Sequence, residues 1–252
     1  SLFRTRQYNM NFRTFQLQEK IQTLISSHQS KLLFRCIDVI DSAYLSNKDL
    51  VEESVDGYDI IGFKGTSSIS DLMTDLKYSQ KDDFHSGFKS KADDIRDSWQ
   101  LEERLKGKSN VILTGHSIGA AIALYYFIYF RTSKDTTLAS KIKMLVCFGM
   151  PRVGSIFFLE DRLEKALAGS GSSVPKLDPA KALHFVILKE GGHLDVVTTI
   201  PKALHSPKEE LMDVVDFYSA KPPSKTSKLL GIHTHRLSAY RESLERLLAG
   251  TL

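Results

Sequence analysis

The pentapeptide Gly115-His116-Ser117-Ile118-Gly119 has the residue types and spacing of a serine nucleophile, because it fits the pattern G-x-S-x-G. In this pattern the serine lies on a tight, strained turn between a strand and a helix. Glycine two residues before and after the serine lets the turn close, since side chains there would collide with the neighbouring chain. The following helix directs unbonded amides and its positive dipole end toward the reacting centre, where they stabilise a developing oxyanion. We therefore predict that Ser117 is a nucleophile.

The surroundings of this motif separate a catalytic serine from a structural glycine-rich turn, which is the alternative for so short a pattern. Residues 111–113 are typical of a strand, and residues 117–130 are apolar nearly all round, as expected for a buried helix. A strand that leads into a helix is the context that the motif requires. The uncharged stretch 111–130 has the length of a membrane span, but polar and turn residues interrupt it at 114–117. We therefore expect a strand, a turn and a buried helix there.

A serine nucleophile needs a base that takes its proton and a carboxylate that orients the base. In α/β-hydrolases the acid follows the serine in the chain, and the histidine follows the acid. Asp195 follows an expected strand, residues 183–188, by a short loop, which places it at the carboxyl end of a strand. Sites in α/β sheets are built at that end. The pattern favours Asp195 as the acid and leaves Asp213 and Asp216 as alternatives.

Several histidines are candidates for the base. Those that follow Ser117 in the chain are His184, His193, His205, His233 and His235. His184 lies in an expected strand before the candidate acids, and His193 lies only two residues before Asp195. The chain order alone leaves three histidines open, namely His205, His233 and His235.

The elements that must position these residues alternate between strand and helix patterns. Asp56-Gly57 between two β-prone runs indicates a hairpin. Further strands are expected at 110–113, 141–148 and 183–188, and helices at 14–28, 87–106, 117–130, 155–167, 207–220 and 236–248, while 32–40 could be either. Residues 169–173 are expected to form a flexible loop, and 221–224 a linker. Such alternation predicts the α/β class, with a mostly parallel sheet covered on both faces.

The composition suits one domain that covers residues 1–252, because 42% of the 252 residues are hydrophobic and no linker separates two balanced halves. The formal net charge of +4 slightly favours an anionic membrane surface, and it is too dispersed for nucleic acid. Cys36 and Cys147 are expected to be free buried thiols, with a disulfide as the alternative. The first residues lack the apolar segment of a secretory signal, which favours a soluble or intracellular location.

Six sequence blocks, in order, resemble the class 3 lipase family, which includes triacylglycerol lipases of filamentous fungi. The resemblance extends from about residue 60 to residue 240. The blocks are Phe63-Lys64-Gly65-Thr66, His85-Ser86-Gly87-Phe88, residues 114–121, residues 148–154, Asp195-Val196-Val197 with Pro201, and His235 with Tyr240. Six blocks in the right order are far more specific than any one of them.

The resemblance implies an α/β-hydrolase fold with a catalytic triad of Ser117, Asp195 and His235. His235 is preferred over His233 because only His235 has a tyrosine at the fifth following position. The oxyanion hole would comprise the backbone amide of Ile118 and, by resemblance, the amide and hydroxyl groups of Thr66. His116 would be structural, as it is in the family. The reaction would need no metal ion and no organic cofactor.

A short apolar stripe follows the first block, at Ile69, Leu72, Met73 and Leu76, and its spacing is that of an amphipathic helix. The plain interpretation is a helix that faces the core. The resemblance implies instead a lid, near residues 67–80, that opens on a lipid surface. Leu72 stands where the best-studied fungal members carry tryptophan, and Lys64 where the family usually has arginine.

The expected activity is therefore hydrolysis of a lipid ester by a lipase. A phospholipase A1 or an acyltransferase is the alternative among enzymes, and a non-catalytic lipid- or partner-binding module is the alternative of another class. The expected partners are a lipid ester substrate and, transiently, a membrane or lipid-droplet surface. Nucleic acid is not expected, and the sequence makes no prediction of oligomeric state.

Overall fold

A computed structural model of the chain describes residues 27–66, 84–155, 159–168, 181–189, 192–193, 196–199, 213–218 and 236–249. These residues contain a seven-stranded sheet in the order β1 (Leu50–Val55), β2 (Tyr58–Phe63), β3 (Val111–His116), β4 (Ile142–Phe148), β5 (Lys181–Lys189) and β6 (Gly192–His193), with β7 (Asp213–Tyr218) paired to β5. Strands β2 to β5 and β7 are parallel, whereas β1 and β6 are antiparallel to their neighbours. The predicted mostly parallel sheet is confirmed. The expectation of a single domain stays a prediction.

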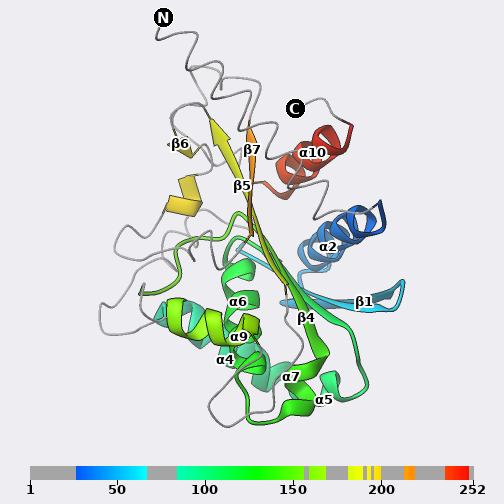
Figure 1. Cartoon of the computed structure of the whole chain (residues 1–252), viewed down its shortest axis with the longest axis vertical. Helices are drawn as coiled ribbons and strands as arrows, with labels where there is room; N and C mark the ends of the chain where they lie inside the picture. The colour runs from blue at the N-terminus through cyan, green and yellow to red at the C-terminus, as the bar shows by residue number, and fades with distance from the viewer. Residues whose placement is uncertain are drawn as a thin grey trace, which may run out of the picture.

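Helices cover both faces of this sheet (Figure 1). On one face α2 (Ser27–Leu45) packs against β1, β2 and β3, and α10 (Leu237–Leu248) packs against α2, β5 and β7. On the other face α6 (Ile118–Arg131) lies on β3 and β4, and α4 (Ser86–Trp99), α7 (Thr136–Lys141) and α9 (Glu164–Ala168) pack against α6. The hydrophobic core accordingly has two parts, one on each side of the sheet.

Helix α6 is apolar nearly all round because it is enclosed by the sheet on one side and by other helices on the other. Residues 111–130 therefore form β3, a turn and α6, as expected, and no membrane span. None of the helices in the described part of the chain is long and apolar enough to cross a membrane.

The hairpin predicted at Asp56-Gly57 joins β1 and β2, where Val55 pairs with Tyr58. Both turn residues have positive φ, 50° for Asp56 and 80° for Gly57. Asp-Gly suits this two-residue turn because aspartate and glycine tolerate the left-handed conformation.

The prediction of a helix at residues 207–220 is wrong, because residues 213–218 form strand β7. The apolar residues Val214, Val215, Phe217 and Tyr218 fit a helical stripe as well as a buried strand, and a short apolar run does not distinguish the two. The backbone of β5 offers a parallel pairing partner along 183–188, and this long-range pairing decides the outcome.

Other helices differ from the sequence prediction in their bounds. The ambiguous residues 32–40 lie in α2, and residues 87–106 form two helices, α4 and α5 (Leu101–Lys106), separated by Gln100 with a φ of 48°. Residues 136–141 form an unpredicted helix, α7, and the expected helix 155–167 includes a π-helical turn, η1 (Leu159–Leu163), before α9. Most of the expected helix 14–28, the loop 169–173 and the linker 221–224 lie outside the described residues.

A buried arginine ends α6. Arg131 exposes 3% of its surface, and its guanidinium group donates to the carbonyl oxygens of Ala166 at 2.8 Å, Ala139 at 3.3 Å and Ile142 at 3.5 Å. These carbonyls lie on α9, on α7 and at the start of β4. One side chain therefore connects three elements at the end of α6 that lies away from Ser117.

Replacement of Arg131 by methionine is expected to lower the free energy of unfolding by about 3 kcal/mol, because buried carbonyl groups lose their donors while the side-chain volume is kept. Urea denaturation followed by circular dichroism measures this. The exposed Arg162, replaced in the same way, serves as the control and should change stability by less than about 0.5 kcal/mol. Equal midpoints for the two variants would contradict the role assigned to Arg131.

Candidate active site

Ser117 lies on the sharp turn between β3 and α6 that the motif predicts. Its φ of 58° and ψ of −129° are in a region that residues with side chains rarely adopt. Its amide donates a hydrogen bond to the carbonyl oxygen of Phe148 at 3.0 Å, and its own carbonyl oxygen accepts one from the amide of Ala120 at 3.0 Å. The end of β4 and the first turn of α6 thus hold the strained residue in place.

The two glycines of the motif are required by close backbone contacts. A Cβ atom on Gly115 would overlap the carbonyl group of Gly119, and a Cβ atom on Gly119 would overlap the carbonyl group of Phe63 at the end of β2. The obstructing atoms belong to the backbone, so no side-chain rotation relieves the overlap. This confirms the prediction from the sequence that side chains at these two positions would collide with the neighbouring chain.

The segment Lys64-Gly65-Thr66 lies directly against this turn, and it is called the oxyanion loop here after the role predicted for Thr66. A Cβ atom on Gly65 would overlap the Tyr44 hydroxyl and the His116 carbonyl oxygen, and it would lie 3.1 Å from the Cβ atom of Ser117. Thr66 follows Gly65, and Ile118, which is 1% exposed, follows Ser117. The predicted site residues Ser117 and Ile118 therefore lie at the carboxyl edge of the sheet, and Thr66 follows the residue that approaches Ser117 there.

Ser117 is enclosed, with 1% of its surface exposed. Its Oγ atom has no hydrogen-bond partner among the residues that the structure describes. Asp195 and His235 lie outside the described residues, as do the lid residues Ile69, Leu72, Met73 and Leu76 and the alternative histidines His205 and His233. The pairing of Ser117 with a base and an acid therefore stays a prediction.

The second and fourth sequence blocks meet beside the turn. His85 precedes α4, and its Nδ1 atom accepts a hydrogen bond from the amide of Gly87 at 3.2 Å. The amide of His85 donates to the carbonyl oxygen of Val153 at 2.7 Å. These bonds join the start of α4 to the segment that follows β4. The same segment comes directly after Phe148, whose carbonyl oxygen accepts the hydrogen bond from the Ser117 amide.

His184 has a structural role. It is buried in β5, and its Nε2 atom accepts a hydrogen bond from the amide of Met150 at 3.1 Å. The neighbouring carbonyl oxygen of Phe185 accepts one from the amide of Gly149 at 3.0 Å. Because its Nε2 atom accepts a hydrogen bond from the backbone, His184 does not act as the base for Ser117. This agrees with the chain order, in which His184 precedes the candidate acids.

The alternative acids lie in β7. Asp213 begins this strand and pairs with Leu183, whereas Asp216 pairs with Val186 farther along. Since β7 is parallel to β5, Asp213 is at the amino edge of the sheet, opposite to the edge at which Ser117 follows β3. This placement weighs against Asp213 as the acid.

The two cysteines, Cys36 on α2 and Cys147 on β4, are buried free thiols. Burial raises the pKa of Cys36 to about 12 and also raises the pKa of Cys147. Both therefore stay protonated at neutral pH and are poor nucleophiles. The prediction of free buried thiols is confirmed, and a Cys36–Cys147 disulfide is not formed. In the described part of the chain, no three His, Cys, Asp or Glu residues are grouped so that they could hold a metal ion.

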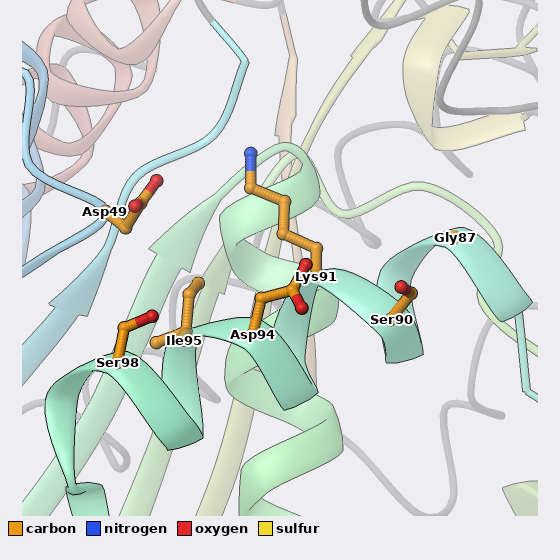
Figure 2. Close-up of a pocket in the computed structure, with 7 residues that line it drawn as sticks. All are labelled: Asp49, Gly87, Ser90, Lys91, Asp94, Ile95 and Ser98. Atoms are coloured by element: carbon orange, nitrogen blue, oxygen red, sulfur yellow. The ribbon is translucent and has the colours of Figure 1, made fainter.

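A surface pocket of about 420 Å³ lies between α4 and the residue that precedes β1 (Figure 2). It is lined by Asp49, Gly87, Ser90, Lys91, Asp94, Ile95 and Ser98. No histidine is among these described lining residues, so the pocket holds no serine–histidine pair. Its two serines, Ser90 and Ser98, lie within α4 rather than on a strained turn, and neither has a positive φ.

Sequence reasoning missed Tyr44, whose hydroxyl contacts the turn. Its Oη atom lies 3.0 Å from Nδ1 of His116, and the backbone of Gly65 forms a hydrogen bond with it. Tyr44 precedes the first sequence block, and no spacing rule connects it to Ser117. Only the tertiary structure identifies it.

A strained serine between a parallel strand and a buried helix, at the carboxyl edge of a sheet covered on both faces, defines an α/β-hydrolase with a nucleophile elbow. Residues 60–167 match the family model described as Lipase (class 3). Over these residues the chain is similar to the class 3 lipase family. The first four sequence blocks lie within the match, and the blocks at Asp195 and His235 follow it.

Solved structures of fungal lipases have the same fold. The triacylglyceride lipase of Rhizomucor miehei is 17% identical, with a TM-score of 0.53, and the alignment covers 78% of this chain and 82% of that one. The native Rhizomucor miehei lipase propeptide complex is 18% identical, with a TM-score of 0.51 and coverage of 78% and 70%. A lipase from Rhizopus microsporus var. chinensis is 16% identical, with a TM-score of 0.51 and coverage of 79% and 77%. No curated protein matches the chain.

Proposed function

We propose that the chain is a serine hydrolase of lipid esters that works through a covalent acyl-enzyme on Ser117. The observation that carries this proposal is the geometry of Ser117: a strained elbow residue whose Oγ atom has no described hydrogen-bond partner and which lies against the oxyanion loop. Strain of this kind is stored at functional sites. The match of residues 60–167 to the class 3 lipase model supports a lipid ester as the substrate.

In the proposed reaction Oγ of Ser117 attacks the ester carbonyl, while His235 takes the proton from Oγ. The amide of Ile118 and the amide and hydroxyl of Thr66 bind the resulting oxyanion. The intermediate then collapses, the bond to the alcohol breaks, and His235 delivers the proton to that alcohol. Water attacks the acyl-enzyme in the same manner and releases the fatty acid and Ser117. Asp195 orients His235 and stabilises its positive charge.

The positions of the neighbouring described elements support Asp195 and His235 in these roles. Strand β6 pairs with Leu188 and Lys189 at the carboxyl end of β5, and Asp195 follows β6 by two residues. His235 immediately precedes Arg236, the residue that caps α10. Asp195 is thus close in the chain to an element at the carboxyl edge of the sheet, the edge at which Ser117 lies, and His235 is next in the chain to the start of α10.

Tyr240, the fifth residue after His235, is buried against the nucleophile elbow. Its ring centroid lies 5.9 Å from that of His116 and 6.0 Å from that of Phe148. The first turn of α10 is therefore anchored beside the residue that precedes Ser117. This contact supports the preference for His235 over His233, since the preference depends on the spacing to Tyr240.

Replacement of His235 by alanine is expected to lower kcat by about 10⁴-fold or more, because Ser117 loses the base that takes its proton. His233 replaced by alanine is the matched control, and it should keep kcat within about threefold of wild type. Initial rates with p-nitrophenyl butyrate measure both. A large loss in the His233 variant alone would transfer the role of base to that residue.

A series of p-nitrophenyl esters from acetate to palmitate, with and without a lipid interface, tests the substrate class. Faster cleavage of long chains supports a lipase, whereas a short-chain optimum would indicate an esterase. If no ester is cleaved under any of these conditions, the proposed hydrolase function is wrong and a binding role gains support. The lid at residues 67–80 and contact with a lipid surface stay predictions, which the effect of the interface on the rate would check.

A further inference from the structure

We propose that Tyr44 is a positioning residue for the reaction of Ser117, because its hydroxyl group joins the oxyanion loop to the nucleophile elbow. The inference rests on the proposed serine hydrolase function and concerns a residue that precedes the segment matched by the family model. Tyr44 lies near the end of α2, which packs against β2 and β3, the two strands that lead into the loop and into the elbow.

A single atom of Tyr44 makes both connections. Its Oη atom lies 3.0 Å from Nδ1 of His116, the residue before the nucleophile, and it also forms a hydrogen bond with the backbone of Gly65. Gly65 can approach this closely only because it has no side chain, since a Cβ atom there would overlap Oη of Tyr44. The hydroxyl group is thus enclosed between the two segments that supply the oxyanion donors.

One arrangement of hydrogens uses every donor and acceptor in this chain of bonds. The Gly65 amide donates to Oη of Tyr44, and the hydroxyl hydrogen of Tyr44 is donated to Nδ1 of His116. His116 then carries its own hydrogen on Nε2. Burial raises the pKa of Tyr44, so the hydroxyl stays protonated and can donate over the whole pH range of ester hydrolysis.

The surrounding contacts restrict both partners. The His116 ring is set edge-on to Tyr44, with 6.0 Å between ring centroids, and edge-on to Tyr240 at 5.9 Å. Asn47 and Asp49, which follow Tyr44 closely in the chain, hold the start of the oxyanion loop. The Nζ atom of Lys64 donates to the side-chain oxygen of Asn47 at 2.7 Å, and the backbone amide of Lys64 donates to the carbonyl oxygen of Asp49 at 2.9 Å. Among these described contacts from the end of α2, that of Tyr44 alone reaches both the loop and the elbow.

This placement sets the spacing of the two proposed oxyanion donors. Thr66 follows Gly65, and the amide of Ile118 lies two residues beyond His116. A change in the distance between Gly65 and His116 therefore changes the separation of the two donors that must converge on one oxygen atom. Such a change weakens binding of the transition state and leaves binding of the ground state nearly unchanged.

The test is the variant Tyr44→Phe, which keeps the ring and removes only the hydroxyl group. With soluble p-nitrophenyl butyrate, kcat is expected to fall by about tenfold to a hundredfold, while KM stays within about twofold of wild type. The rate at which a fluorophosphonate labels Ser117 is expected to fall by a similar factor, since the phosphonyl oxygen needs the same donors.

The matched control is Tyr126→Phe, because the Tyr126 hydroxyl also makes a buried hydrogen bond, to the carbonyl oxygen of Ala92 between α6 and α4. Its loss should reduce stability and leave kcat and the labelling rate unchanged. An equal loss of activity in both variants would overturn the inference, because it would show a general effect of removing a buried hydroxyl.

The outcomes separate this inference from the proposed function. If wild type hydrolyses the ester and labels at Ser117, but Tyr44→Phe retains wild-type kcat, the positioning role is wrong and the hydrolase function stands. If wild type shows neither reaction, the proposed function itself fails. Nitrogen-15 spectra of the wild-type protein give a check that needs no variant: Nδ1 of His116 should be an unprotonated acceptor, and a proton on Nδ1 would overturn the assignment.

Discussion

Replacement of Ser117 by alanine is expected to abolish ester hydrolysis, with kcat falling by about 10⁵-fold or more. The proposed reaction passes through an acyl-enzyme on Oγ of this residue, and no other residue from Gly115 to Gly119 carries a hydroxyl or thiol group. The residual rate would come only from oxyanion donors and substrate binding. Folding should be unaffected or slightly improved, because the change removes a buried hydroxyl group that has no described hydrogen-bond partner.

The measurement combines initial rates on p-nitrophenyl butyrate with mass spectrometry after fluorophosphonate treatment. Wild type should gain one phosphonyl group on the peptide that contains Ser117, and the Ser117→Ala variant should gain none. Ser140 replaced by alanine is the control, since it is a serine on α7 whose hydroxyl donates a hydrogen bond within that helix, to the carbonyl oxygen of Thr137 at 2.9 Å. Retained hydrolysis in a correctly folded Ser117→Ala protein would exclude the proposed mechanism.

Replacement of Gly119 by alanine is expected to lower the free energy of unfolding by about 3 kcal/mol and to remove activity. The added methyl group would overlap the carbonyl group of Phe63, which ends β2, and contact the carbonyl carbon of Lys64 at 2.9 Å. These atoms belong to the backbone, so the first turn of α6 must move away from β2. That shift displaces the amide of Ile118 from the oxyanion loop, and activity is lost even in molecules that remain folded.

Gly107 replaced by alanine is a suitable control for this prediction. Gly107 ends α5 with a φ of −80°, and a Cβ atom there would meet no atom within 4 Å. The control should differ from wild type by less than about 0.5 kcal/mol in urea denaturation and should retain full activity. A Gly119→Ala protein with the stability and rate of this control would show that α6 does not depend on its close approach to β2.

Local signals in the sequence determined much of the fold. Asp56-Gly57 specified a hairpin because few dipeptides accept positive φ at both positions. The apolar runs of β3, β4 and β5 specified buried parallel strands, and the apolar surface of α6 specified a helix that is enclosed on most sides. The motif around Ser117 specified the elbow: Gly115 is required by its contact with Gly119 inside the motif, whereas Gly119 is required by its contact with Phe63 on β2.

Contacts between residues far apart in the chain decided the rest. Residues 213–218 are compatible with a helix and a strand, and the open edge of β5 selects the strand. Arg131 and Tyr44 have ordinary sequence surroundings, and each acquires its role from partners on other elements. Periodicity and motif spacing report what a residue does within its own element. The position of a hydroxyl group between an oxyanion loop and an elbow depends on how α2 packs on β2 and β3, and only the tertiary structure contains that information.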